Sequence, residues 1–220
     1  MKKAIRNIAA GILFGLASFL PMKANAQNNK IDASVEIVQS KNNPTSFIRP
    51  NLFYKIFGLD GYSFFEFYRN ENFFGKTIIS KDFGVRAKGV KPTAEIVYGS
   101  GFNDSYGLGV NYDVPMPKRA QKRASLNVKA LPVWFNNKGY LDDKVMVGYF
   151  GSLDLPRGFI LSSFGEINVG SKGGPQWGYG EIRFGKKFSN HLSVAYNPLL
   201  KNRGKLSPKW EHAISARYTF

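Results

Sequence analysis

Residues able to perform covalent chemistry are few in this chain, and one group of them has a suggestive spacing. The 220 residues include two histidines and no cysteine, so the usual ligands of a zinc site are scarce. His191 and Ser193 stand two positions apart, and Glu211 lies in the last segment. A serine nucleophile, a histidine base and an acidic residue would suit ester cleavage. These three residues form the candidate catalytic group. In a hairpin of the last two segments, however, His191 and Glu211 would lie at opposite ends, too far apart to touch.

A larger set of capable residues consists of charged side chains that recur at every second position. Fixed charges on one face of a strand can line a water-filled interior. We expect the following lumen-lining residues: Arg49, Lys55, Glu66, Asp82, Arg86, Lys88, Glu95, Asp113, Lys129, Glu166, Glu181, Arg183, Glu211 and Arg217. With Asp32 and Glu36, this face carries seven basic and nine acidic residues. Such a balance predicts cross-strand ion pairs that narrow or fill the lumen.

The elements that must position these charges are β-strands. In 105–113, Tyr106, Leu108, Val110 and Tyr112 alternate with small or polar residues, the pattern of a strand with one apolar face. Turn residues separate such segments at short intervals. We predict about twelve strands, with ten as the alternative: 31–39, 46–57, 62–69, 77–88, 93–99, 105–113, 124–134, 144–153, 159–170, 177–188, 191–198 and 210–220.

Some residues inside these segments lead to specific expectations. Trp134 falls on the apolar face of its segment, whereas Phe164 falls beside Glu166 on the charged face. Proline cannot donate a hydrogen bond to a strand ladder. Pro50 and Pro132 should therefore each mark a bulge or a strand end.

The all-β pattern fits three architectures: a soluble sandwich, a soluble lipocalin-like barrel and a transmembrane barrel. Here the apolar faces carry aromatic residues near the strand ends, as in the aromatic girdles of membrane barrels. The opposite faces are charged in segment after segment. We therefore predict a closed antiparallel transmembrane β-barrel, which satisfies the backbone hydrogen bonds in lipid and leaves no open sheet edge.

The N-terminus has the three regions of a secretory signal peptide. A basic start precedes the apolar stretch Ile8–Leu20, and Ala24 to Ala26 give a small-x-small cleavage pattern. Thirteen helical residues are too short to span a bilayer. We expect residues 1–26 to be cleaved and 27–220 to form the barrel.

The net charge is strongly positive. The chain carries a formal charge of +16, and loss of residues 1–26 would leave 27 basic against 15 acidic residues, or +12. Much of the excess lies in predicted turns and loops, where it would suit phosphates of lipid or lipopolysaccharide. Export and dispersed charge argue against nucleic acid as a partner. The expected lipid-contacting residues are Lys118, Arg119, Lys122, Arg123, Lys201, Arg203 and Lys205.

The C-terminus ends on an aromatic residue within an alternating segment. Phe220, preceded at alternate positions by Tyr218, Ala216 and Ile214, resembles the C-terminal assembly signal of Gram-negative outer-membrane β-barrel proteins. The resemblance implies recognition by the barrel assembly machinery and insertion into the outer membrane.

Two further resemblances bear on function. His191 and Ser193 on the penultimate strand and Glu211 on the last are distantly similar to the outer-membrane lipid A deacylases, although Val194 stands where that family has asparagine. The proportions of the chain resemble those of short-looped oligosaccharide-specific porins. We expect a small porin-like channel for polar or anionic solutes, without a cofactor, rather than an enzyme. A non-conducting structural or lipopolysaccharide-interacting barrel is the alternative.

Overall fold

The fold is almost entirely β-structure. The computed structural model describes residues 30–41, 46–56, 58–69, 72–81, 89–100, 104–136, 138, 140–142, 144–170, 174–201 and 209–220. Within these ranges no helix is long and apolar enough to cross a membrane. The expected signal peptide, residues 1–26, lies outside them.

The strands follow one another along the chain with short connections. They are β1 (Lys30–Ser40), β2 (Phe47–Ile56), β3 (Leu59–Tyr68), β4 (Phe73–Lys81), β5 (Val90–Gly99), β6 (Ser105–Asp113), β7 (Ala124–Asn136), β8 (Leu141–Asp142), β9 (Lys144–Asp154), β10 (Phe159–Gly170), β11 (Gly174–Lys187), β12 (Leu192–Tyr196), β13 (Leu199–Lys201), β14 (Lys209–Glu211) and β15 (Ala213–Thr219). A single 3-10 turn, η2 (Pro156–Gly158), precedes β10 among the described residues.

These segments make twelve barrel strands in the described part of the chain. β8 is a two-residue extension paired with β7. β12 and β13 keep one register against β11 and form one interrupted barrel strand. β14 and β15 likewise form the last one. The twelve-strand prediction is therefore confirmed over the alternative of ten.

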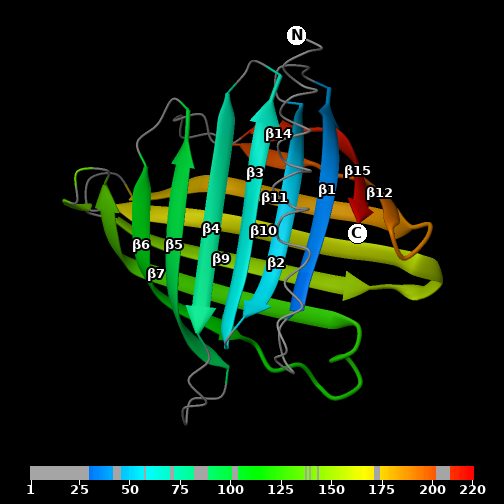
Figure 1. Cartoon of the computed structure of the whole chain (residues 1–220), viewed down its shortest axis with the longest axis horizontal. Helices are drawn as coiled ribbons and strands as arrows, with labels where there is room; N and C mark the ends of the chain where they lie inside the picture. Colours follow the sequence, from blue (N-terminus) through cyan, green and yellow to red (C-terminus); the bar gives the residue numbers. More distant parts are fainter. Residues whose placement is uncertain are drawn as a thin grey trace.

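The sheet closes on itself. Consecutive barrel strands pair antiparallel, β10 pairs with β11, and β1 pairs with β15. In Figure 1 the yellow to orange strands cross behind the blue to green ones at a steep angle, as the tilted strands of a barrel do. Closure excludes the sandwich. We call the end where β1 begins and β15 finishes the terminal end, and the other the loop end.

The barrel is polar inside and apolar outside. Among the described residues, 17 polar or charged side chains are buried against 10 hydrophobic ones, and many large hydrophobic side chains are exposed. This distribution is the reverse of a soluble barrel. On the last strand, Ile214 and Tyr218 are exposed while Ser215 is buried, as the alternation predicts. An apolar exterior of this kind suits contact with lipid.

The outer surface repeats one packing device. Tyr54, Tyr98 and Tyr149 stand directly opposite glycines on the neighbouring strands. At Gly75, an added Cβ would lie 2.1 Å from a ring carbon of Tyr98. The glycine therefore gives the tyrosine ring room to lie flat on the sheet, which fixes the cross-strand pair.

The alternation fails at one bulge. Two residues of β7, Leu131 and Pro132, lie opposite Gly109 of β6, and the register shifts there. The expectation for Pro132 is thus confirmed, but the shift reverses the faces beyond it. Trp134 points into the barrel with 2% exposure, so its predicted outward position is wrong.

Two other expectations about the strands are also wrong. Pro50 lies inside β2 opposite Val35 with no change of register. The β2–β3 pairing leaves out residues 49 and 50 and resumes at Asn51 in the same register. The missing N–H of Pro50 therefore requires no bulge. The predicted segment 77–88 starts too late, because β4 runs from Phe73 to Lys81. Its proposed second half, residues 82–88, lies outside the described residues.

Candidate functional site

The middle of the lumen contains a set of four charges that we call the lysine network: Lys76, Glu95, Lys129 and Glu166. Lys76 Nζ lies 3.0 Å from Glu95 and 2.5 Å from Glu166, and Lys129 Nζ lies 2.7 Å from Glu166 and also bonds Glu95. Each lysine thus contacts both carboxylates. The side chains are at most 9% exposed. Because β4 and β10 lie on opposite sides of the barrel, the Lys76–Glu166 pair crosses the lumen.

A second set, the arginine network, comprises Glu36, Arg49, Glu66, Glu181, Arg183 and Arg217. At its centre Arg49 reaches Glu66 at 2.6 Å and Glu181 at 2.9 Å. Tyr179 accepts a hydrogen bond from Arg49 and donates one to Glu181. Arg49 on β2 and Glu181 on β11 are 132 residues apart. This contact is the second connection across the lumen.

The rest of the arginine network is organised around Glu36. This carboxylate is fully buried and takes Arg217 at 3.1 Å, Arg49 at 3.5 Å and Arg183. Arg183 also donates to Ser215 at 3.1 Å. Among the described residues, Arg183 and Arg217 both form their ion pair with Glu36, so two guanidinium groups share one carboxylate.

Between these networks and the terminal end lies a cavity of about 700 Å³, which we call the vestibule. Its floor includes Arg49, Lys76, Lys129 and Glu181. Among its described lining residues nine are basic and five acidic. The lining is cationic because carboxylates of the networks, such as Glu36 and Glu95, are fully buried beneath their cations.

On the loop-end side of the networks, two apolar clusters pack beside buried polar residues such as Ser40 and Glu211. Val38, Phe47, Leu199 and Ala213 form one buried cluster. Leu131, Trp134 and Met146 form another. The described lumen therefore consists of a wide polar half and a packed half, with the two ion-pair networks between them.

The structure distributes the predicted lumen residues over these regions. Arg49, Glu66, Glu95, Lys129, Glu166, Glu181, Arg183 and Arg217 belong to the two networks. Lys55 and Asp113 lie on the vestibule, where their side chains are 57% and 51% exposed. Glu211 is buried at the loop-end side, on β14. Asp82, Arg86 and Lys88 lie outside the described residues.

Sequence reasoning missed four of the cations that line the vestibule: Lys30, Lys76, Lys91 and Lys187. Lys76 falls just outside the predicted segment 77–88, but β4 begins three residues before it. Lys91 falls between the predicted segments 77–88 and 93–99, but it contacts Asp60 at 2.7 Å and Asp113 at 2.8 Å. Alternation extended backward from Ser80 through Ile78 would have placed Lys76 on the lumen face.

The candidate catalytic group is not brought together. Ser193 stands opposite Arg217, and Glu211 stands opposite Leu199. The six positions between these points correspond to about 20 Å along the strand. His191 contacts the carbonyl oxygen of Thr219 at 2.8 Å at the terminal end. Across the described residues, no cluster of three potential metal ligands is present either.

The predicted surface residues lie mostly as single exposed groups. Ile214, Tyr218 and Phe220 are exposed on the outside of the last strand. Lys118, Arg119, Lys122 and Arg123 belong to the connection between β6 and β7 at the terminal end, in which the amide of Arg123 bonds the carbonyl of Ala120. Arg203 and Lys205 are outside the described residues, as is the side chain of Lys201.

Comparisons with known proteins concern the fold. No family model matches this chain, and no curated protein matches it by sequence. Among solved structures, the chain is similar to the KdgM porin, alone and in complex with disordered oligogalacturonate. Each similarity has a TM-score of 0.58, 9% identity, and coverage of 86% of this chain and 99% of that one. Variants of the Rhodopseudomonas blastica porin match with a TM-score of 0.41 and 10% identity over 81% of this chain and 57% of theirs. The similarity to the KdgM porin and the closed barrel together give the chain a porin-like fold, which supports an outer-membrane location.

Proposed function

We propose that this protein is a porin-like channel of the Gram-negative outer membrane that admits small polar or anionic solutes. The observation that carries the proposal is the vestibule, a cation-rich cavity of about 700 Å³ inside a barrel with an apolar exterior. This volume lies within the range of about 300–1,000 Å³ that is common for ligand sites. The solved complex of the KdgM porin with oligogalacturonate supports a polar solute.

The channel would be narrow at the two networks. Arg49–Glu181 and Lys76–Glu166 cross the lumen, and small ions would have to pass beside them. We expect the purified full chain to give small, discrete conductance steps in planar bilayers, with anions more permeant than cations. Arg49→Ala removes one cross-lumen contact and should enlarge the steps, whereas Arg123→Ala in the exposed β6–β7 connection should not. Folded wild type and folded Arg49→Ala that both fail to conduct would contradict the proposal.

A second function, a non-conducting structural barrel, is favoured by the packed loop-end half of the lumen. In this alternative the basic connections contact lipid phosphates, and the last strand is recognised by the barrel assembly machinery. It predicts no conductance from the wild type. It also predicts altered detergent and antibiotic sensitivity after Lys201, Arg203 and Lys205 are replaced by Gln, or after Lys118, Arg119, Lys122 and Arg123 are replaced together.

A further inference from the structure

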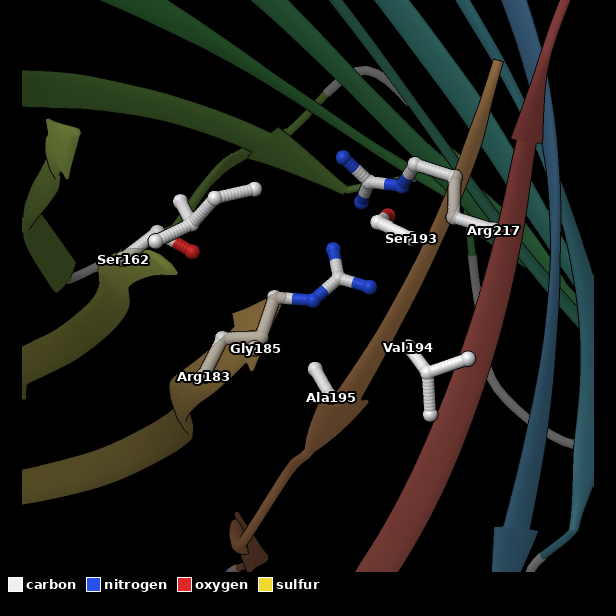
Figure 2. A pocket seen from close by; sticks show the side chains of 8 residues that line it. Ser162, Arg183, Gly185, Ser193, Val194, Ala195 and Arg217 are labelled. Atoms are coloured by element: carbon white, nitrogen blue, oxygen red, sulfur yellow. The ribbon is translucent and has the colours of Figure 1, made fainter. Parts of the chain in front are cut away.

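A small cavity branches from the vestibule wall between β10, β11, β12 and β15, and we call it the arginine pocket. Its volume is about 50 Å³. Two cross-strand pairs frame it: Arg183 stands opposite Ser162, and Arg217 stands opposite Ser193. Figure 2 shows the two guanidinium groups pointing into the same space, with both serines at its margin.

Small residues create this space. Gly185 and Ala195 face each other across β11 and β12 and line the pocket. A Cβ added at Gly185 would lie 2.7 Å from that of Ala195, so the strands pack closely here. Beside the long side chains of Arg183 and Arg217, a glycine and an alanine leave the lumen face hollow. The hollow is therefore specified by side-chain size as well as by charge.

The pocket has positive charge that its protein partners do not balance locally. Arg183 and Arg217 share Glu36, which also contacts Arg49. Glu36 contacts Nη2 of both arginines. Because each guanidinium has five N–H donors, this contact uses only part of its donor capacity. Among the described residues, Nε of Arg217 has no hydrogen-bond partner. One additional anion would balance the positive charge that the single shared carboxylate leaves over.

The size of the pocket limits what that anion can be. A water molecule needs about 10–15 Å³ of this kind of volume. The 50 Å³ present therefore accommodates a group of roughly four water-sized atoms, which matches a phosphate or a carboxylate with its first carbon. Serine hydroxyls can donate to the oxygens of such a group, while the arginines offer charge-assisted hydrogen bonds.

We propose that the arginine pocket binds a small oxyanion through Arg183 and Arg217, with Ser162 and Ser193 as hydroxyl donors. Its biological role as a solute site on the transport path rests on the proposed channel function. The binding itself follows from the geometry of the pocket and is a property of the folded barrel whether or not it conducts. The pocket shares Ser162, Arg183 and Arg217 with the vestibule lining, so a solute in the vestibule can reach it.

The test is a calorimetric titration of the detergent-solubilised full chain with inorganic phosphate and, separately, with acetate. Wild type should bind both. Arg183→Gln and Arg217→Gln should each weaken binding by at least about tenfold, because each removes a charge-assisted contact. Ser193→Ala should weaken it by about three- to tenfold without a change in net charge. Ala195→Leu should abolish binding by filling the pocket while leaving every charge in place.

Lys55→Gln is the matched control, because it removes a vestibule cation outside the pocket. Heat-modifiable migration on gels checks that each variant is folded. No binding by folded wild type, or an equal loss in Lys55→Gln and Arg217→Gln, would overturn the proposal. Conductance is measured separately: a conducting barrel that does not bind oxyanions refutes the pocket alone, and a binding barrel that does not conduct refutes the channel alone.

Discussion

The two ion-pair networks in the lumen hold equal numbers of opposite charges but distribute them differently. In the lysine network each of two lysines contacts both of two carboxylates. In the arginine network Arg49 takes Glu66 and Glu181, while Arg183 and Arg217 share Glu36. In the lysine network each cation is therefore balanced by the carboxylates next to it. In the arginine network the charges balance only when all six residues are counted together.

The difference follows from the chemistry of the side chains. An ammonium group is a compact charge with three donors, which two carboxylates can satisfy. A guanidinium group offers five donors in a planar fork, so it keeps donors free after one carboxylate is bound. Both networks contribute cations to the vestibule floor. We infer that the lysine network chiefly holds the barrel walls together, while the arginine network also keeps N–H donors free toward the vestibule.

The largest expected effect is on the lysine network. Glu166→Gln leaves Lys76 and Lys129 with Glu95 as the remaining carboxylate of the network, and an uncompensated buried charge costs about 3–5 kcal/mol. We expect a loss of that size in the free energy of unfolding, measured by urea titration of barrels in lipid vesicles. Adding Lys76→Met restores the charge balance and should recover much of the loss. If Glu166→Gln alone were as stable as wild type, water would have to reach the lysine network, and the network would not hold the barrel walls together.

The next effect concerns the geometry of Arg49. Arg49→Lys keeps the charge but cannot reach Glu66 and Glu181 with a planar fork, so at least one charged hydrogen bond is lost. We expect a decrease of about 2–3 kcal/mol in the free energy of unfolding. Arg123→Lys, the same change at an exposed position, is the control and should have no effect. Equal stability of both variants would mean that charge alone matters at residue 49.

Arg217→Gln should sharpen the contrast between the networks. Glu36 keeps Arg49 and Arg183 as partners, so the free energy of unfolding should fall by about 1 kcal/mol. The same variant removes a cation from the vestibule and should lower the anion-to-cation permeability ratio, read from reversal potentials in a salt gradient. A loss of 3 kcal/mol or more would place Arg217 in the same class as Glu166. An unchanged ratio would contradict its part in selectivity.

The sequence predicted the barrel because its main signal is local. Lipid-facing and lumen-facing residues alternate with period two, so Tyr106, Leu108 and Val110 reveal their strand without any knowledge of its neighbours. The alternation fails where a distant strand intervenes. Trp134 changes face because two residues of β7 stand opposite Gly109, and nothing in residues 124–134 alone indicates that bulge except Pro132.

The site was harder to predict because its contacts cross the barrel. Alternation placed Arg49 and Glu181 on the same side of the sheet, but their pairing depends on closure over 132 positions. Lys76 is missing from the predicted lumen face because the predicted segment begins at residue 77. Gly75, just before it, makes room for Tyr98 on the next strand. The arginine pocket depends on Gly185 and Ala195, small residues that carry no chemical signal in the sequence.

The smallest expected effect is at the vestibule rim, where the ion pairs are exposed to solvent. Lys91 contacts Asp60 and Asp113, whose side chains are 32% and 51% exposed. Ion pairs of this kind contribute about 0–1 kcal/mol and are screened by salt. Lys91→Gln should therefore lower the free energy of unfolding by less than about 1 kcal/mol, and the difference should vanish in 1 M salt. A larger, salt-insensitive loss would extend the buried networks to the rim and remove the distinction between the vestibule and its floor.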